Sequence, residues 1–374
     1  MEVRPANARE LEVWDDFVVT AGGGHVYQST AWARHRAASG WRPHHLVAAD
    51  GSAVLALERR WPIVGGGSAY LPRGPVPAGV ARAMALRLEA FTGWLAGHGI
   101  DVVASDAEIE AGTGYPELIR AGGFHPIEEI QPSRHRLALA LGHGADESGA
   151  LADVAKATRQ RIRAAEKAGT VVVRYDRSRG AEGEPGEGFT RPPEDSDAAL
   201  DRFYDLLLET GERRHFAFGP RAGYLAWWRA ALAAGMLVLL EARGSDGRPL
   251  AGLVLYRHGG RLSAVHSGDH ASARREQPGS LHLLRWRAIQ LAIREGCAEM
   301  DLGGVDVPGA RRPPVEGEPM YGLYEHKRSF GASWVELAGA HERVIRPRRY
   351  ALGRAVARVA RIVRPAGASR DGGG

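Results

Sequence analysis

Cysteine is almost absent from this chain, with Cys297 alone among 374 residues. A single cysteine cannot form an intramolecular disulfide, and it excludes a zinc site built from several cysteines. Long apolar runs are missing as well, because no stretch approaches the roughly 18 consecutive apolar residues of a membrane span. Residues 1–5 lack the basic and then apolar pattern of a secretory signal. These absences predict a cytoplasmic protein.

Catalytic signatures of several common kinds are missing too. The sequence offers no constellation for Ser-His-Asp nucleophilic catalysis and none for a catalytic metal. What remains is a composition of 44% hydrophobic and 25% charged residues, which is ordinary for a globular protein. The length favours two domains of ordinary size. The net charge of +5 says little by itself. What matters is where along the chain the positive residues cluster.

The first third of the chain interleaves strand and helix patterns. Residues 44–57 read as a hairpin turned at Asp50-Gly51. Residues 80–96 and 115–121 predict helices, whereas 101–104 and 136–141 predict strands. After residue 197 a similar order returns: helices 198–210 and 224–234, a hairpin from 236 to 256, strand 262–266, helix 280–294 and strand 299–302. The chain therefore predicts a duplicated α+β unit.

Residues 152–169 predict the clearest helix. Lys156, Arg159, Arg163 and Lys167 fall on one face, and Val154, Thr158, Ile162 and Ala165 form the opposite one. The following segment 177–197 is rich in Gly, Pro, Glu and Asp, which predicts a mobile surface loop.

Five phrases together resemble the Fem family (FemABX) of tRNA-dependent aminoacyltransferases. They are YQSTAW (27–32), YLPRGPV (70–76), RAAEKAG (163–169), DLGGV (301–305) and YGLYEHKRSFG (321–331). Each is weak alone, but their order and spacing over roughly residues 25 to 340 are specific. The resemblance implies two tandem GNAT-like domains. Because no long heptad-like segment is present, it is to the compact members without a coiled-coil arm.

The resemblance also implies domain limits. Residues 1–148 would form the first domain, completed by about 335–365 returning from the C-terminus. Residues 149–334 would form the second domain with the mobile loop at 177–197, and 365–374 would be a disordered tail.

The activity that the resemblance implies is transfer of glycine, alanine or serine from aminoacyl-tRNA to an amine of a peptidoglycan precursor. The acceptor would be lipid II or the nucleotide-linked muropeptide, with no cofactor. Alternatives stay open: the same donor with a small-metabolite acceptor, an acyl-CoA-dependent GNAT enzyme, or a non-catalytic RNA- or membrane-binding protein. Against CoA, Pro278 stands where the pyrophosphate-binding loop should have its first glycine.

Candidate site residues follow from the family motifs. Lys327 matches the family's lysine near the tRNA 3′ end, where a cation would stabilise developing negative charge. Its competing interpretation is a solvated lysine on a strand edge. His326 replaces a frequent aromatic residue and could supply a base. Asp301 is expected to cap the tight turn before Gly303.

The acceptor is expected to meet cations and hydroxyl donors, for which the motifs offer Arg34, Tyr70, Arg73, Arg213 and His266. For tRNA binding the candidates are Lys156, Arg159, Arg163 and Lys167, since contacts of basic residues to phosphates are independent of sequence. A packing or solvated role is the alternative for each.

The C-terminal tail from 343 to 364 contains many arginines and no acidic residue. As a helix it would place Leu352 and Val356 opposite Arg354 and Arg358, the pattern of a basic interfacial helix. We expect either peripheral contact with the anionic inner leaflet of the membrane or packing on the first domain.

Overall fold

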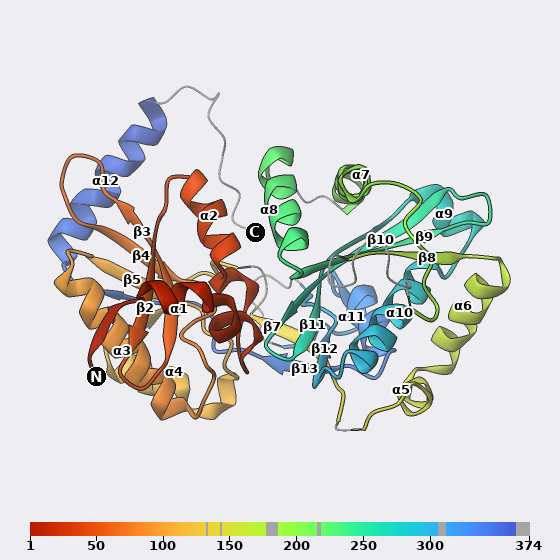
Figure 1. Ribbon diagram of the computed structural model, residues 1–374, viewed down its shortest axis with the longest axis horizontal. Coiled ribbons are helices and arrows are strands. Elements are labelled where there is room, and N and C mark those ends of the chain that lie inside the picture. Colours follow the sequence, from red (N-terminus) through yellow and green to blue (C-terminus); the bar gives the residue numbers. More distant parts are fainter. Residues whose placement is uncertain (132–133, 143, 177–185, 215–217, 306–311, 364–374) are drawn as a thin grey trace. The chain divides into compact units, whose positions relative to one another are not determined.

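The computed structural model describes residues 1–131, 134–142, 144–176, 186–214, 218–305 and 312–363 (Figure 1). The first part of the expected mobile loop, 177–185, and the expected disordered tail, 365–374, lie outside the described residues. The chain forms two compact units. Unit 1 comprises residues 1–135 and 336–374, and unit 2 comprises residues 136–335.

Unit 1 is built on a sheet of seven strands in the order β1-β2-β3-β4-β5-β14-β6. Neighbours pair antiparallel except β4 and β5, which are parallel. Gly51, with φ of +80°, makes the predicted tight turn between β2 and β3. The strand bounds are β1 Val3–Pro5, β2 Arg42–Ala48, β3 Ala53–Arg60, β4 Gly67–Leu71, β5 Val102–Ser105, β6 His125–Pro126 and β14 His341–Val344.

The helices of unit 1 are α1 Ala8–Glu12, α2 Thr30–Ala38, α3 Ala81–Gly97, α4 Tyr115–Ala121 and α12 Pro347–Val363. Ser29 caps α2 by accepting a hydrogen bond from the Trp32 amide at 3.0 Å. Helix α3 buries Leu88 and Phe91 against sheet residues such as Leu46 and Val103, which form the core of this unit.

Unit 2 is also built on seven strands, in the order β13-β7-β12-β11-β10-β9-β8. Here β11 and β12 form the parallel pair, and the other pairings with recorded register are antiparallel. The strand bounds are β7 His135–Ala140, β8 Val171–Tyr175, β9 Leu237–Arg243, β10 Pro249–His258, β11 Arg261–Asp269, β12 Glu299–Asp301 and β13 Ser333–Glu336.

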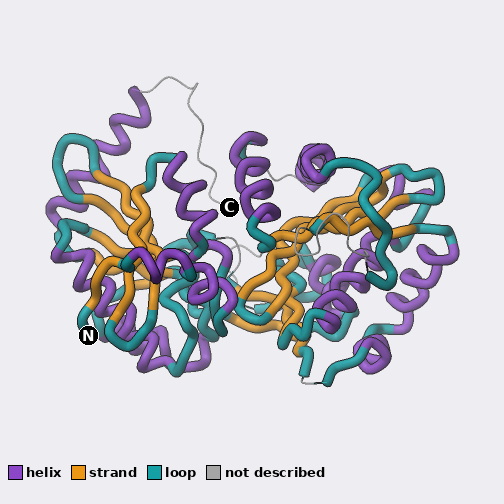
Figure 2. Tube along the Cα trace, in the orientation of Figure 1, coloured by secondary structure: helices purple, strands orange, loops and turns teal. Residues whose placement is uncertain are grey.

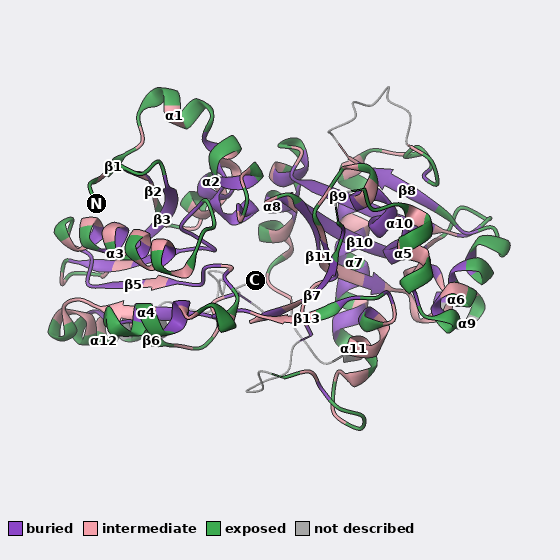
Figure 3. Ribbon diagram, turned by 90° about the horizontal axis from the view of Figure 1, so that it is seen from below, coloured by how far each residue is buried: buried purple, intermediate pink, exposed green. Residues whose placement is uncertain are grey.

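The helices of unit 2 are α5 Glu147–Asp153, α6 Lys156–Lys167, α7 Ser196–Arg214, α8 Arg221–Ala233, α9 Ala271–Glu276, α10 Ser280–Arg294 and α11 Tyr321–Arg328. Figure 2 shows them around the strands of unit 2. Leu284 and Ile289 of α10 pack with Leu240 and Leu253 of the sheet in one apolar core, which is the purple interior of this unit in Figure 3.

The two sheets repeat one plan with an exchanged strand. In unit 1, β14 lies between β5 and β6; in unit 2, β7 occupies the corresponding place between β12 and β13. Each inserted strand is supplied by chain that follows the edge strand of the other sheet, since β7 comes after β6 and β14 comes after β13. The predicted α+β duplication is therefore confirmed, and the strand order shows which strands are exchanged.

Local predictions agree closely with most of these bounds, but two of the predicted segments differ from them. The single helix expected over 152–169 is divided, because Val154 has extended backbone (φ −69°, ψ 131°) and ends α5. The expected loop 177–197 is packed in its described half, where Phe189 is buried and the Thr190 amide donates to the Val172 carbonyl at 2.8 Å. Among the described residues, no helix has the length and apolarity needed to cross a membrane.

Candidate functional site

A buried lysine marks the centre of unit 2. Lys327 lies near the end of helix α11 and is only 5% exposed, so the interpretation as a solvated strand-edge lysine is wrong. Its Nζ donates to the Gly304 carbonyl at 2.7 Å. A Cβ on Gly303 would lie 2.5 Å from the Ala264 carbonyl oxygen and 3.3 Å from this Nζ. The lysine is therefore confined beside the turn that follows β12.

This location is where the parallel strands part. Strand β12 pairs with β11 only through Arg261, Ser263 and the residue between them, while β11 continues to Asp269. The diverging backbones leave a gap beyond Ser263 that side chains must fill. Asp301 ends β12 and accepts the Gly303 amide at 2.7 Å, which confirms the expected cap of the tight turn.

A second buried cation fills this gap. Arg285 of α10 is 2% exposed, and its Nη2 donates to Ser267 Oγ of β11 at 3.3 Å. Its Nη1 donates to the Leu302 carbonyl at 3.5 Å, a long contact at the end of β12. Burial lowers the pKa of Arg285 to about 10, so the guanidinium keeps its charge near neutral pH.

Burial also lowers the pKa of Lys327 well below its usual value, and the charge of Arg285 lowers it further. Asp301 acts in the opposite direction but does not cancel these effects. The two buried cations thus form an electropositive centre in which Lys327 gives up its proton more readily than an ordinary lysine.

Two histidines extend the line of polar contacts that begins at Arg285. Its Nε donates to Nε2 of His326 at 3.0 Å, so the neutral His326 ring carries its proton on Nδ1. That Nδ1 lies 3.2 Å from Nε2 of His282 on α10. Burial, and then the charge of Arg285, lowers the pKa of His326, while burial lowers that of His282 to about 4. Both rings are therefore neutral hydrogen-bonding groups at neutral pH.

A polar pocket of about 610 Å³ opens beside these histidines at the beginning of α10. Its polar lining comes from Arg161, Asp269, Gln277, Ser280, His282 and His326. Gly279, with φ of +106°, brings the chain against the Arg161 carbonyl, where a Cβ would be only 2.4 Å away. The first amides of an α-helix lack intrahelical partners and favour negative charge, so this pocket suits an anionic or carbonyl group.

The acceptor candidates of unit 2 are held by neighbouring groups. Arg213 on α7 pairs with Asp269 at 2.9 Å and with Glu209 at 3.3 Å, which ties α7 to β11. His266 on β11 packs among the rings of Tyr224 and Trp228, at centroid distances of 5.7 and 5.8 Å. Burial lowers the pKa of His266 to about 4, so it contributes a neutral ring.

In unit 1, Tyr70 and Arg73 are brought together around a carboxylate. Tyr70 donates its hydroxyl to Asp106 Oδ2 at 2.8 Å, and the Arg73 amide donates to Asp106 Oδ1 at 2.8 Å. The Arg73 guanidinium is 3.7 Å from Asp106 and 3.9 Å from Glu108. Arg34, by contrast, is exposed on α2.

The basic stripe of α6 is only partly available. Lys156, Arg163 and Lys167 are exposed. Arg159 instead donates from Nη1 to the carbonyls of Ala152 and Val154 at 2.9 and 2.6 Å, and so holds the end of α5. Three of the four candidates thus present charge to solvent.

The prediction from sequence missed Arg285, His282 and Asp106. A signal existed for Arg285, because it falls on the stripe of α10 that includes Leu284, Ala288 and Ile289 and is buried throughout. A charged residue within an apolar stripe marks a buried site. Asp106 lies two residues after the predicted strand 101–104, but nothing in the sequence identified its partners.

The two strand orders are those of tandem α+β units of the GNAT type. Residues 152–328 match the family model described as "Acetyltransferase (GNAT) domain". The chain has the fold of FemX, with a TM-score of 0.74 and 18% identity over 94% of this chain and 99% of that one. This confirms the expected resemblance to the Fem family at the level of the fold.

Two further solved structures share the fold more loosely. They are a conserved protein of unknown function from Bacteroides thetaiotaomicron (TM-score 0.55, 11% identity, 91% of this chain and 98% of that one) and L-PGS from Bacillus licheniformis (0.51, 12%, 96% of each). No curated protein sequence matches the chain. The GNAT match and the shared fold support a transferase.

Proposed function

We propose that the protein transfers an aminoacyl group from aminoacyl-tRNA to an amine of a peptidoglycan precursor, lipid-linked or nucleotide-linked. The observation that carries the proposal is the pair of buried cations, Arg285 and Lys327, at the divergence of β11 and β12. The proposal also rests on the FemX-like fold.

Aminoacyl transfer from an ester to an amine requires little from the protein beyond an electropositive centre of this kind. The acceptor amine attacks the ester carbonyl, a C–N bond forms, the C–O bond to the ribose breaks, and one amine proton goes to the ribose oxygen. Negative charge develops first on the carbonyl oxygen and then on the leaving oxygen. Arg285 supplies the fixed positive charge, since its pKa of about 10 keeps it protonated.

Lys327 is suited to transfer of the amine proton. Burial and the charge of Arg285 lower its pKa well below the usual lysine value, so it releases a proton more readily than an ordinary lysine and can move the proton between the amine nitrogen and the ribose oxygen. His326 is a positioning residue in this scheme, because its Nε2 already accepts from Arg285 and cannot act as a base there. The exposed Lys156, Arg163 and Lys167 supply phosphate contacts for tRNA.

The test is transfer of radiolabelled glycine, alanine and serine from charged total tRNA to lipid-linked and nucleotide-linked muropeptide. We expect labelling that RNase abolishes and that falls about 100-fold or more in Lys327→Ala, the typical loss when a group that transfers a proton is removed. Arg287→Gln is the matched control, because this arginine lies on α10 with Arg285, bonds Glu166 and Gln290 and is not one of the two buried cations. Labelling of neither acceptor would favour the small-metabolite alternative.

An acyl-CoA donor is the second candidate, and the pocket at the beginning of α10 favours it, together with the GNAT match over 152–328. Pro278 remains the feature against it. Transfer from acetyl-CoA without tRNA, resistant to RNase, would replace the first proposal with this one.

Membrane contact through α12 belongs to the same proposal. One face of this helix packs on unit 1, where Gly353 lies against the Trp61 ring and Arg349 pairs with Asp101 at 2.7 Å. The other face exposes Arg348 and Leu352. We expect flotation with anionic vesicles that Leu352→Asp weakens; equal flotation of both proteins would remove the membrane from the proposal.

A further inference from the structure

The loop that joins β3 to β4 in unit 1 presents apolar side chains to solvent at its tip. Pro62 and Ile63 are exposed, and Val64 beside them is half-buried. Ile63 is 97% exposed, the highest value among the large apolar residues that the structure describes. A single exposed apolar side chain needs no explanation by itself, so the backbone that holds Ile63 is the more informative feature.

That backbone is strained. Ile63 has φ of +69°, and the Val64 amide donates to the Pro62 carbonyl at 2.8 Å across it. A positive φ bridged by a hydrogen bond from residue i+2 to residue i is the strained form of the γ-turn, and a β-branched residue there is an outlier. Gly65 and Gly66, just beyond, adopt positive φ without a Cβ clash. Strain of this kind occurs mainly at functional positions, and here it holds the Ile63 side chain in solvent.

One buried carboxylate joins this loop to helix α12. Asp101 Oδ2 accepts from Trp61 Nε1 at 2.9 Å and from the Gly67 amide at 3.2 Å, while its Oδ1 accepts from Arg349 Nε at 2.8 Å. The Trp61 ring also packs on α12, since a Cβ on Gly353 would lie 2.5 Å from it. The loop and the helix therefore form one continuous surface of unit 1.

The outer face of α12 continues the apolar tip. Arg348, Leu352, Ala355 and Arg358 follow one another at spacings of four and three residues, so they lie on one side of the helix, and all four are exposed. An apolar middle is thus placed between two arginines. Apolar side chains flanked by arginines are typical of a helix that lies in a membrane interface.

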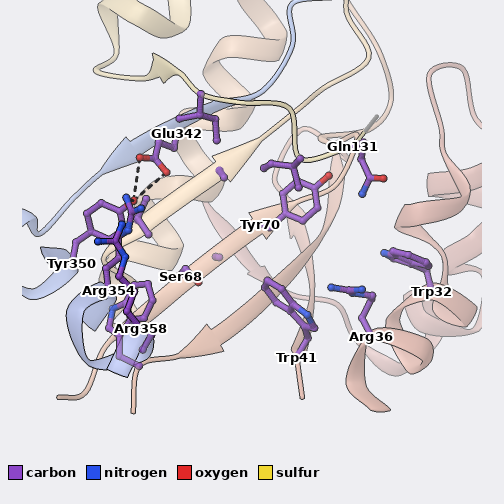
Figure 4. A pocket seen from close by; sticks show the side chains of 17 residues that line it. Trp32, Arg36, Trp41, Ser68, Tyr70, Gln131, Glu342, Tyr350, Arg354 and Arg358 are labelled. Carbon is purple, nitrogen blue, oxygen red and sulfur yellow. Dashed lines mark hydrogen bonds between the residues drawn. The ribbon is translucent and has the colours of Figure 1, made fainter. Parts of the chain in front are cut away.

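Carboxylates near the loop and α12 have partners of their own. Glu58 is 2% exposed and pairs with Arg60, which begins the loop and is half-exposed. Glu342 accepts the Tyr350 hydroxyl at 3.2 Å (Figure 4). The exposed charge around the tip is therefore positive, which complements an anionic surface. A fluid bilayer accepts a protruding apolar tip without a preformed hollow.

We propose that the β3–β4 loop and the outer face of α12 form one docking surface for an anionic bilayer. Ile63 and Leu352 enter the boundary between headgroups and acyl chains, and Arg348 and Arg358 bind lipid phosphates. This inference rests on the membrane contact in the proposed function and deepens it, because it assigns the loop, rather than the helix alone, as the element that inserts. The arginines select anionic lipid, and Ile63 supplies the apolar anchor.

Flotation with vesicles of phosphatidylglycerol and phosphatidylcholine measures docking without a donor or an acceptor. Ile63→Asp should lower the vesicle partition coefficient about 10-fold, since an apolar anchor is replaced by a charge that the anionic surface repels. Arg348→Gln/Arg358→Gln should lower it by a similar factor, about 10-fold, and more at low salt. Vesicles of phosphatidylcholine alone should bind the wild type weakly.

Val80→Asp is the matched control. Val80 is also an exposed β-branched residue of unit 1, 76% exposed at the N-cap of α3. Arg346, at the start of α12, bonds the opposite end of α3 through the Ala96 carbonyl, roughly 25 Å along the helix. The same new charge at Val80 should therefore change the partition coefficient less than about twofold.

Ile63→Gly separates docking from a structural role. Glycine relieves the positive φ, so the thermal midpoint should be unchanged or higher while flotation falls. A lower midpoint with full flotation would instead make Ile63 a structural residue and overturn the proposal.

Equal flotation of Ile63→Asp and the wild type also overturns it; if Leu352→Asp alone weakens flotation, α12 docks without the loop. A wild-type dimer that Ile63→Asp dissociates, with no flotation of either protein, would assign the surface to a second copy of the chain and overturn the proposal as well. Transfer is measured separately, so a failed reaction is distinguishable from failed docking.

Discussion

The two units share one sheet topology, but the charged side chains that they bury at the corresponding place have opposite sign. In unit 2, β11 and β12 pair over three residues and then part, and the gap holds the cations Arg285 and Lys327. In unit 1, β4 and β5 stay paired from Ser68 to Leu71, and the first residue beyond β5 is the buried carboxylate Asp106.

The elements that supply the buried side chains differ between the units. In unit 2, long cationic side chains arrive from helices, Arg285 from α10 and Lys327 from α11. In unit 1, the chain just after β5 supplies Asp106, which accepts from Tyr70 and Arg73. Duplication of a fold therefore does not duplicate its site.

The largest expected effect comes from neutralising the buried arginine of each unit. Arg285→Gln should lower kcat about 100-fold or more, as for loss of one transition-state donor, with KM for tRNA little changed. Arg73→Gln should instead lower the thermal midpoint, because it leaves Asp106 and Glu108 without their cation. Steady-state transfer kinetics and calorimetry of both variants measure this; a reversed outcome would show that unit 1 carries the chemistry.

Asp106→Ala should have the next largest effect, which we expect as a loss of stability. The carboxylate is 1% exposed and accepts from two donors, so its removal should cost about 3–5 kcal/mol, as for a broken buried charge pair. Denaturant unfolding measures the loss. Glu117→Ala is the control, since this exposed carboxylate makes a surface pair with its helix neighbour Arg120. Similar free energies of unfolding for both variants would contradict the cluster as a stabilising centre.

Gly303→Ala tests the confinement of Lys327. The added Cβ would lie 2.5 Å from the Ala264 carbonyl at a positive φ of 78°, which should cost about 1–3 kcal/mol and displace the lysine. Transfer should fall with it. Gly93→Ala, in helix α3 with open space around the position, should be neutral or stabilise by up to about 1 kcal/mol. If Gly303→Ala keeps full stability and activity, the turn is not confined.

His266 should make the stability of unit 2 depend on pH. Its pKa is about 4 in the fold against 6.5 for an unperturbed ring, so below pH 6.5 the unfolded chain binds a proton that the fold does not. Stability from this group is therefore complete above pH 6.5 and is lost as the pH falls toward 4. His266→Phe should reduce the fall in thermal midpoint between those limits, measured by scanning calorimetry. An unchanged slope would contradict burial of this ring.

The smallest effect should come from the α6 stripe. Each of Lys156→Ala, Arg163→Ala and Lys167→Ala should weaken tRNA binding modestly and reduce the slope of log K against log salt by roughly 0.7–0.9. Arg159→Ala should instead loosen the end of α5, because this arginine holds backbone carbonyls. Salt titrations of tRNA binding separate the two behaviours, and an identical slope in all four variants would remove the stripe from the tRNA surface.

Much of the fold was accessible from local pattern. Helix α4 over 115–121 and helix α10 over 280–294 have the predicted bounds, and both hairpins turn at their Asp-Gly pairs. These elements follow from hydrophobic period and turn chemistry, which depend on neighbours in the chain. Helix α11, which carries Lys327, was not predicted, because its eight residues show no clear apolar stripe.

The sequence by itself determined the duplication, the hairpins, the major helices and the lysine that matches the Fem motif. The tertiary structure decided that this lysine is buried beside Arg285, that Arg159 donates hydrogen bonds to backbone carbonyls, and that Arg213 is paired with Asp269. It also decided the place of β7 between β12 and β13 in the second sheet. The physical reason is that periodicity and turn propensity are local, whereas burial and the pairing of charges depend on contacts that form only after folding, such as that of Arg213 with Asp269, 56 positions further along the chain.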